Sequence, residues 1–450
     1  MSDEITPDPT TTENQEVVQK ETAKPTANSQ ESIRKGIRPR TAKRLAIMAV
    51  ILIALVYGFR WFIGLKGDII LPSDTTTMVS ALKLLDQGSQ AVVIDPQGKV
   101  TESIDYVAGK SDRDLAWDPK GNRLFFISDR KEDSFHIYRW DPQRNAVDQK
   151  SIDRAGRSNL VFDVQDKGLG DLIGLVLVRG TVQEFTPQTA KSQQVMPPTI
   201  KAKEGEEQGS SSTFELIYKR YGRSFKAARW FGDRRYIAAV MSREDRGQSL
   251  IVQDTTPGEN GAPRAPQLIF VAEKINIAVD PATGNLVFTL TEVLPILDPE
   301  GKPVKGPDGN PVKYGFSHGI FLLDTAGGKL QIQPIGTSPD RNTNFSNPVP
   351  SPDGKSMMFL VGKYAGEGNM EVAALESCEL IPSGIQKHVT LSEGNVSDPS
   401  YSPDGSKIAY VKQEARHQAI FIASSDGSGA KNLTGSAGDF ASPLFSPQYK

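Results

Sequence analysis

The sequence has little of what marks a disulfide scaffold, a metal site or a nucleic-acid-binding surface. It contains one cysteine, Cys378, and four histidines among 450 residues. One cysteine cannot form an intramolecular disulfide, and no Cys pair has metal-ligand spacing, so we expect Cys378 to be a small buried or inert thiol. The formal net charge of −2 lacks the strong basic excess that usually announces nucleic-acid binding. We therefore predict no nucleic-acid partner and no cofactor.

The first 44 residues contain almost no clustered apolar side chains. They are rich in Thr, Glu, Pro, Gln and Asn up to residue 33 and end in a basic segment, Arg34 to Arg44. Such a composition cannot bury enough apolar surface to offset the entropy lost on ordering. We predict a disordered cytoplasmic tail over residues 1–44, whose basic end sets the topology and contacts anionic lipid; a docking site for a cytoplasmic partner is the alternative.

One long apolar run follows, from Leu45 to Leu65, with Arg60 as its only charged residue. As a helix it would be about 31 Å long, which matches a hydrocarbon core of about 30 Å, and Arg60 lies near the outer end, where it can snorkel. The long flank before it and the lack of a small-x-small cleavage site favour an uncleaved anchor over a cleaved signal or a buried core helix. Because positive charges precede the run, we predict a single-pass protein of a bacterial inner (plasma) membrane, with a cytoplasmic N-terminus and the remainder periplasmic or extracellular.

A short motif recurs along the rest of the chain. Its clearest copies are Asn347-Pro-Val-Pro-Ser-Pro-Asp-Gly and Asp398-Pro-Ser-Tyr-Ser-Pro-Asp-Gly, and weaker copies begin at Asp114, Asn159, Ala227 and Asn276. In the best copy, the Pro-Asp-Gly turn is followed by two segments with the composition and alternation of strands, Lys407 to Lys412 (KIAYVK) and Ala419 to Ser424 (AIFIAS). A polar edge strand, Ala430 to Thr434, comes next. With the strand before the turn, each unit has four antiparallel strands, as a β-propeller blade does.

The spacing of these units predicts the number of blades. Equivalent turn positions recur every 44 to 71 residues, roughly the 40–50 expected per blade once two insertions are removed. One insertion is the polar stretch from Lys201 to Ser212. The other, Asp298 to Lys313, contains a Pro/Gly doublet that predicts an extended hairpin or loop. The turn positions are Pro119, Val164, Gly232, Pro281, Pro352, Pro403 and Pro447.

The two ends of the repeat region predict how the ring closes. The last segment, Ala441 to Gln448, supplies one strand, and the segment from Gln90 to Ile104 looks like the later strands of a blade. Pairing them would leave no exposed edge. We predict an all-β propeller of about seven four-stranded blades over residues 88–450, six blades being the alternative, after a linker at 66–87. Met78 to Gln87 has a pattern that suits a strand or a helix.

The units Ser351–Phe359 and Ser402–Tyr410, and the segment Ile420–Thr434, resemble the repeats of the TolB-type propeller family. The resemblance implies a propeller over about 350 residues. It implies less about function, because such propellers occur in envelope scaffolds, in sugar- and peptide-binding proteins, and as the gating domain of prolyl peptidases. The long tail and the uncleaved anchor depart from the soluble periplasmic member of the family.

Three groups of residues are candidates for chemistry. Gly315-Phe316-Ser317-His318-Gly319 matches G-x-S-x-G, with Asp324 and His388 in the right order for a triad, but a strand pattern follows where a nucleophile elbow needs a helix, so we predict the entry to a strand. His136, His318, His388 and His417 are dispersed, and the Asp353-Gly354 and Asp404-Gly405 turns are expected to bond their own backbone rather than calcium. Arg229, Arg234 and Arg235 with Trp230 form a candidate binding patch, although Trp230 occupies a core position of the repeat. We predict no catalytic, cofactor-binding or metal-binding residue.

These observations favour a protein-binding or scaffolding module of the cell envelope over an enzyme. Partners are expected to be envelope proteins, with the membrane contacted through Leu45 to Leu65, and the two insertions are candidate contact regions. A ligand of unknown identity would lie at the propeller channel. The alternatives are a propeller subunit of a peptidase or glycan-acting enzyme, and a ligand sensor that signals through the anchor.

Overall fold

The computed structural model describes the repeat region. The described residues are 78–101, 104, 106–119, 123–131, 134–142, 144–151, 156–162, 172–198, 224–243, 247–258, 261–295, 298–300, 302–325, 328–336, 343–366, 369–381 and 384–447. The chain divides into two units, Met1–Leu71 and Pro72–Lys450, and every described residue belongs to the second. The predicted tail, the anchor at 45–65 and the insertion at 201–212 lie outside this set. Within it, no helix has the length and apolar character needed to cross a membrane.

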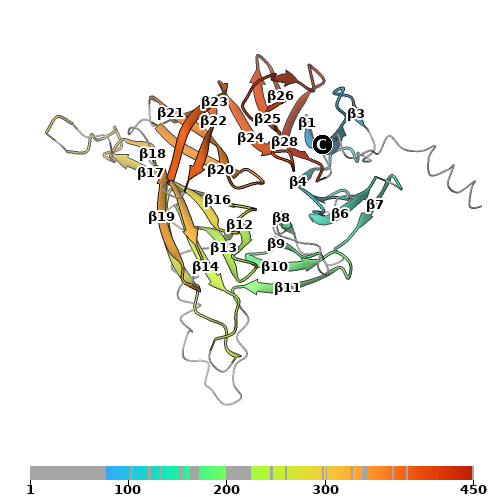
Figure 1. Cartoon of the computed structure of the whole chain (residues 1–450), viewed down its shortest axis with the longest axis horizontal. Coiled ribbons are helices and arrows are strands. Elements are labelled where there is room, and N and C mark those ends of the chain that lie inside the picture. The colour runs from blue at the N-terminus through green and yellow to red at the C-terminus, as the bar shows by residue number, and fades with distance from the viewer. Residues whose placement is uncertain are drawn as a thin grey trace, which may run out of the picture. The chain divides into compact units, whose positions relative to one another are not determined.

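The second unit is a seven-bladed β-propeller, as Figure 1 shows, and each blade is a four-stranded antiparallel sheet. The first strands of successive blades contact one another all the way round the channel. For blades 1 to 7 in turn, these first strands are β4 (Asp112–Trp117), β8 (Arg157–Phe162), β12 (Ser224–Phe231), β16 (Lys274–Val279), β20 (Thr343–Pro350), β24 (Val396–Tyr401) and β28 (Asp439–Phe445).

The remaining strands follow outward in each blade. The second strands are β5 (Leu124–Ser128), β9 (Gly174–Val178), β13 (Tyr236–Ser242), β17 (Leu286–Pro295), β21 (Ser356–Gly366), β25 (Lys407–Glu414) and β1 (Val79–Leu85). The third are β6 (His136–Asp141), β10 (Thr181–Thr186), β14 (Gln248–Asp254), β18 (Lys313–Asp324), β22 (Asn369–Ile381), β26 (His417–Ser424) and β2 (Gly88–Ile94). The fourth are β7 (Ala146–Gln149), β11 (Lys191–Met196), β15 (Gln267–Ala272), β19 (Gln331–Gly336), β23 (Gly384–Glu393), β27 (Lys431–Asn432) and β3 (Val100–Thr101).

The chain ends close the ring in blade 7. β28 pairs with β1, with Phe445 opposite Val79 and Asp439 opposite Leu84, so the C-terminal strand becomes the first strand of a blade whose other three strands are N-terminal. This confirms the predicted closure by the two chain ends and the count of seven, but the strand that pairs with β28 is β1 and not the predicted segment from Gln90 to Ile104. The structure also corrects the predicted start at residue 88. β1 belongs to the blade, so the range Met78 to Gln87 contains a strand and not a linker or a helix.

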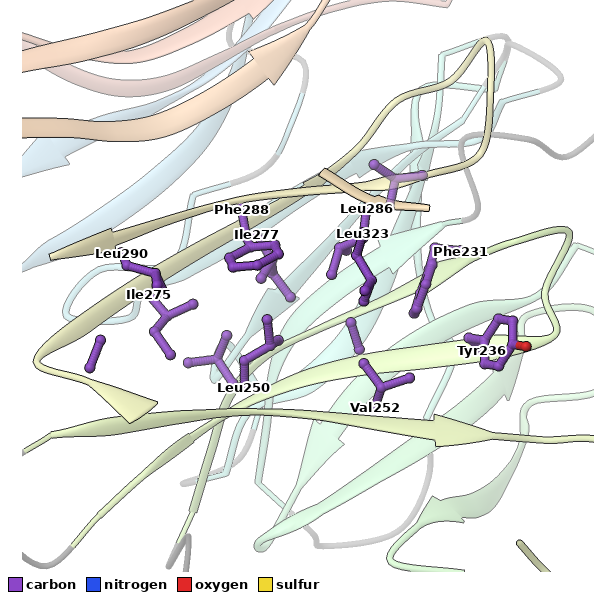
Figure 2. Packing of buried hydrophobic residues seen from close by; sticks show 14 residues of the cluster. Phe231, Tyr236, Leu250, Val252, Ile275, Ile277, Leu286, Phe288, Leu290 and Leu323 are labelled. Atoms are coloured by element: carbon purple, nitrogen blue, oxygen red, sulfur yellow. The ribbon is translucent and has the colours of Figure 1, made fainter. Parts of the chain in front are cut away.

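The core consists of seven apolar clusters, one between each pair of neighbouring blades. Successive residues of a strand enter different clusters: Val79 and Ala81 pack toward blade 6, whereas Met78 and Leu82 pack toward blade 1. Figure 2 shows the cluster between blades 3 and 4, where Leu250 and Phe288 meet from facing sheets. Because both faces of most strands are buried, β5 and β9 read as continuous apolar runs and not as alternating ones.

Antiparallel order separates the connections onto two faces of the propeller. The turn face carries the turns between first and second strands and those between third and fourth strands. The hairpin face carries the connections between second and third strands and those between blades. The hairpin face is where β17–β18 and β21–β22 extend beyond the usual blade length, and Figure 1 shows the β17–β18 hairpin projecting away from its blade. Of the two structures predicted for Asp298 to Lys313, an extended hairpin or a loop, the chain forms the hairpin.

Candidate functional site

The G-x-S-x-G motif lies inside a strand. Ser317 pairs with Thr291 within the β17–β18 ladder, and β18 continues to Asp324 without a turn. A nucleophile elbow requires the serine on a sharp turn between a strand and a helix. The backbone at Ser317 does not have this geometry, in agreement with the predicted strand entry.

The histidines lie on different blades. His136 is buried in blade 1, where Ser134 and Ser151 bond its two ring nitrogens at 2.9 and 3.4 Å. His388 in blade 5 is 3.4 Å from Glu376, and His417 in blade 6 is 3.7 Å from Asp439. Across the described part of the chain, no three His, Cys, Asp or Glu side chains are grouped so that they could hold a metal.

The aspartates of the Ser-Pro-Asp-Gly turns bond their own turns. Ser402 donates to Asp404 Oδ1 at 2.6 Å, and the Ser406 amide donates to the same oxygen at 3.0 Å. These bonds lower the pKa of Asp404, with the Ser402 hydroxyl as the largest cause. Ser402 also accepts from the Lys407 amide at 2.9 Å, and Gly405 has a φ of 71°, which a residue with a Cβ adopts at a cost. The motif is therefore a local turn device.

Cys378 is buried in β22. Its side chain is 2% exposed and packs in the cluster between blades 4 and 5. Burial raises the pKa of its thiol to about 12. A thiol with so little thiolate at neutral pH is a poor nucleophile, so Cys378 is an inert core residue.

The candidate patch of arginines and Trp230 is divided among three places. Trp230 is 8% exposed and belongs to the core between blades 2 and 3. Arg234 and Arg235 lie on the turn after β12, on the turn face, whereas Arg229 lies on β12 beside the channel. The structure therefore does not bring these four residues together as one surface.

Arg235 belongs to a cluster around Asp254. Arg235 donates to Asp254 Oδ2 at 3.0 Å, and Arg264 Nε is 3.6 Å from the same oxygen. The Thr256 hydroxyl and amide donate to Asp254 Oδ1 at 2.7 and 3.0 Å. Burial of Asp254 opposes its ionisation, but the hydrogen bonds from Arg235 and Thr256 outweigh it, so the pKa of Asp254 is lowered.

A belt of short polar residues lines the channel, and we did not predict it. In each of five blades, one residue of the first strand has a positive φ, between 48° and 54°. It lies where the pairing register between the first and second strands shifts. Asp and Asn adopt this conformation more readily than most residues, because their side chains bond locally. These residues are Asp114, Asn159, Asn347, Asp398 and Ser442.

Belt side chains bridge from one blade to the next at three seams. Asp114 Oδ2 accepts from the Asn159 amide at 2.8 Å, and Asp398 Oδ2 accepts from the Ser442 amide at 3.0 Å. Asn159 Oδ1 accepts from the Ala228 amide and from Arg229 Nη1, both at 3.2 Å. The signal was present in the sequence, because most copies of the repeat open on Asp, Asn or Ser.

Arg229 is the most perturbed cation of the channel wall. Burial lowers its pKa to about 10, and the charge of Asp114 opposes that shift only in part. It also donates to the Ala228 carbonyl at 2.8 Å. At neutral pH it therefore remains a cation in the channel wall.

A buried ion pair lies in blade 1, and its aspartate is hydrogen-bonded to blade 7. Arg130 Nη2 donates to both carboxylate oxygens of Asp112 at 2.8 and 2.9 Å, and both side chains are 5% exposed. Asp112 also accepts from the amide of Ala91 in β2 at 2.9 Å. The Arg130 guanidinium lies over the ring of Phe126, 4.7 Å from its centroid. Because both carboxylate oxygens and the guanidinium have partners, this cluster serves the structure.

Comparison with known proteins gives matches among solved structures alone. No protein-family model matches the sequence, and no curated protein matches it. Among solved structures it is similar to TolB from Acinetobacter baumannii, with 12% identity, coverage of 83% of this chain and 67% of that one, and a TM-score of 0.44. It is also similar to an oligogalacturonate lyase in complex with manganese (10% identity, 79% and 84% coverage, TM-score 0.46) and to a prolyl endopeptidase (13% identity, 81% and 49% coverage, TM-score 0.48).

Proposed function

We propose that this chain is a membrane-anchored, extracytoplasmic propeller that binds a protein partner and acts as a scaffold in a bacterial cell envelope, without catalytic activity of its own. The apolar run from Leu45 to Leu65 behind a basic segment supports the anchor and its orientation. The propeller that follows provides a rigid ring on which loops are displayed.

The observation that carries the proposal is the projecting hairpin of blade 4. Its tip contains two successive turns, each organised by an aspartate. Asp298 Oδ1 accepts from the amides of Glu300 and Lys302 at 3.1 and 2.7 Å, and Asp308 Oδ1 accepts from the Asn310 amide at 3.0 Å. The Val312 amide donates to the Val304 carbonyl at 2.8 Å, which joins the two sides of the tip. A tip ordered in this way can bind a partner with little further loss of entropy.

The surface of this tip suits a protein contact. Val304 is 37% exposed, and Lys302 and Lys305 beside it are also exposed, so the tip offers apolar and cationic contacts. The extended β21–β22 hairpin of blade 5 leaves the same face next to it. β11 ends and β12 begins on the hairpin face as well; the insertion at 201–212 lies between them in the sequence, outside the described residues.

The strand geometry at Ser317 favours binding over hydrolysis of the serine-hydrolase type. The motif lies in the stem of the projecting hairpin, where its backbone is paired with β17. Its residues therefore support the tip mechanically.

Crosslinking in intact cells tests the proposal. The full chain would be compared with a variant in which residues 302–311 are replaced by a Gly/Ser segment of equal length, and captured proteins would be identified by mass. The control is Lys355→Ser, an exposed change on the turn face of blade 5. We expect envelope proteins captured by the full chain and the control to be missing from the hairpin variant. Equal capture by all three, or capture of none, would reject the proposal.

A further inference from the structure

The rim of blades 2, 3 and 4 has a second surface with the properties of a binding site. The loop from Thr255 to Pro266 lies between two grooves, which have Asp254 in common. The cationic groove, about 570 Å³, lies between blades 3 and 4. The neutral groove, about 350 Å³, lies between blades 2 and 3. Both volumes are in the range of known ligand sites, about 300–1,000 Å³.

The cationic groove has an excess of positive charge. Arg235, Arg264 and Lys329 line it, and Asp254 is its one carboxylate, which leaves two uncompensated positive charges among the lining side chains. Arg235 is held in place, because its guanidinium pairs with Asp254 and lies 4.9 Å from the ring centroid of Tyr236. Arg264 is 49% exposed and Lys329 is also exposed, so both can pair with a ligand. A groove of this kind selects an anionic group.

The neutral groove has a different lining. Gln193 and Gln194 of blade 2 present amides that both donate and accept, and Pro198, Pro257 and Pro263 present apolar surface. This mixture of amide and apolar groups suits the backbone and side chains of an extended peptide.

Gln253 adds an independent indication of a ligand in the neutral groove. It is 2% exposed, and its amide nitrogen donates to the carbonyls of Asp254 and Arg264 at 2.9 and 2.8 Å, which holds the two ends of the loop together. Its Oε1 is buried without a hydrogen-bond partner and belongs to a residue that lines the groove. A buried acceptor without a donor is costly, and a peptide N–H would satisfy it after a small displacement of the loop.

We propose that these two grooves together bind an extended acidic peptide segment of a partner protein, with its carboxylates on Arg264 and Lys329 and its backbone against the glutamines. An acidic glycan fits less well, because the only aromatic ring in either lining belongs to Tyr236, which is 3% exposed and offers no face for a sugar ring. The cationic groove lies on the turn face. No described residue of the projecting hairpin lines either groove, so the site is distinct from that hairpin.

The test uses the full chain in detergent and a fluorescently labelled hexaglutamate peptide, followed by anisotropy at about 50 mM salt, where charge attraction is only moderately screened. Arg264→Gln/Lys329→Gln should weaken binding at least about tenfold, because two charge-assisted contacts are lost. Asp254→Asn should tighten binding several-fold, because it removes the carboxylate that competes for Arg235 and Arg264. The matched control, Lys355→Gln/Lys431→Gln, removes two exposed cations elsewhere and should bind as the unaltered protein does.

Three results would overturn the proposal: no binding of hexaglutamate, equal weakening in the control variant, or binding of oligogalacturonate through Arg264 and Lys329 without binding of the peptide. Thermal unfolding of each variant shows whether a loss of binding is a loss of folding. The Gly/Ser hairpin variant is expected to bind hexaglutamate normally, so failure of this proposal and failure of the hairpin proposal give different results.

Discussion

The ion pair between Arg130 and Asp112 and the one between Arg235 and Asp254 differ in how much water reaches them. In blade 1 both side chains are 5% exposed, and the Ala91 amide donates one further hydrogen bond to the Asp112 carboxylate. In blade 3 the Asp254 side chain is 9% exposed, but Arg235 is 36% exposed and a second cation, Arg264, is 49% exposed. The first cluster has balanced charges and is almost closed to water. The second has an excess of positive charge and is open to water.

This difference separates a structural role from a binding role. A buried pair contributes little beyond a well-packed apolar pair, yet removal of one partner leaves a buried charge without compensation. An accessible cluster with excess charge contributes little to folding but retains cations that a ligand can use.

The largest expected effect comes from Arg130→Met. The variant leaves the Asp112 carboxylate buried without its cation, which should reduce the free energy of unfolding by about 3–5 kcal/mol. Urea unfolding followed by tryptophan fluorescence measures the change. The double variant Arg130→Met/Asp112→Leu should recover only part of it, because the Ala91 amide loses its acceptor. A loss below about 1 kcal/mol for the single variant would mean that the pair behaves like an exposed one.

Asp398→Ala tests the belt, where a carboxylate bonds a backbone amide across a seam. The variant loses the bond to the Ser442 amide, worth about 0.5–1.5 kcal/mol, and places alanine at a φ of 49°, at a cost of about 1 kcal/mol. We expect a loss of about 2 kcal/mol in urea unfolding. Asp398→Asn keeps an acceptor and suits this φ, so it should be close to the unaltered protein. Equal losses in both variants would show that the seam does not depend on this bond.

The sequence predicted the repeat and closure by the chain ends, and it favoured seven blades over six, for a local physical reason. The Ser-Pro-Asp-Gly turn is encoded in consecutive residues, and Ser402, Asp404 and Gly405 form its bonds within five residues of one another. The strand patterns beside it follow from burial of one or both faces. The open choice between strand and helix at Met78 to Gln87 was decided by pairing with β28, which lies at the far end of the sequence.

The site of the two grooves could not be predicted from the sequence, because its residues are distant along the chain. The belt left one signal, the Asp, Asn or Ser that opens most copies of the repeat, but the partners of these residues lie in the next blade. Arg235 and Lys329 lie on turns of two blades and Asp254 ends β14, and only their shared face brings them together. The grouping of Arg229, Arg234 and Arg235 followed proximity in sequence, which strand geometry does not respect. Residues on a turn and residues in the preceding strand point to different parts of a propeller.

Arg235→Met sharpens the comparison with Arg130→Met, since both variants remove an arginine from an aspartate. The expected fall in the urea midpoint is much smaller at Arg235, because water solvates the cluster and Arg264 remains beside Asp254. The small fall in the urea midpoint caused by Arg235→Met should shrink further in about 1 M salt, where the Debye length is about 3 Å. The fall caused by Arg130→Met should persist. Similar losses at the two sites, or equal salt dependence, would contradict the assignment of separate roles.

The smallest expected effect is the pH dependence of the stability that the Asp254 charge contributes to the fold. Its pKa is lowered in the folded protein, so its charge stabilises the fold above the unfolded value of about 3.9, and this contribution disappears as the pH falls through the lower folded value. Asp254→Asn should therefore cost about 0.5 kcal/mol at pH 7 and nothing measurable near pH 2–3. Urea midpoints of the two proteins across this range give the comparison. A difference that grows in acid would mean that the folded state favours the protonated carboxyl, in which case Arg235 and Arg264 would not be held by Asp254 and the cationic groove would have a different arrangement.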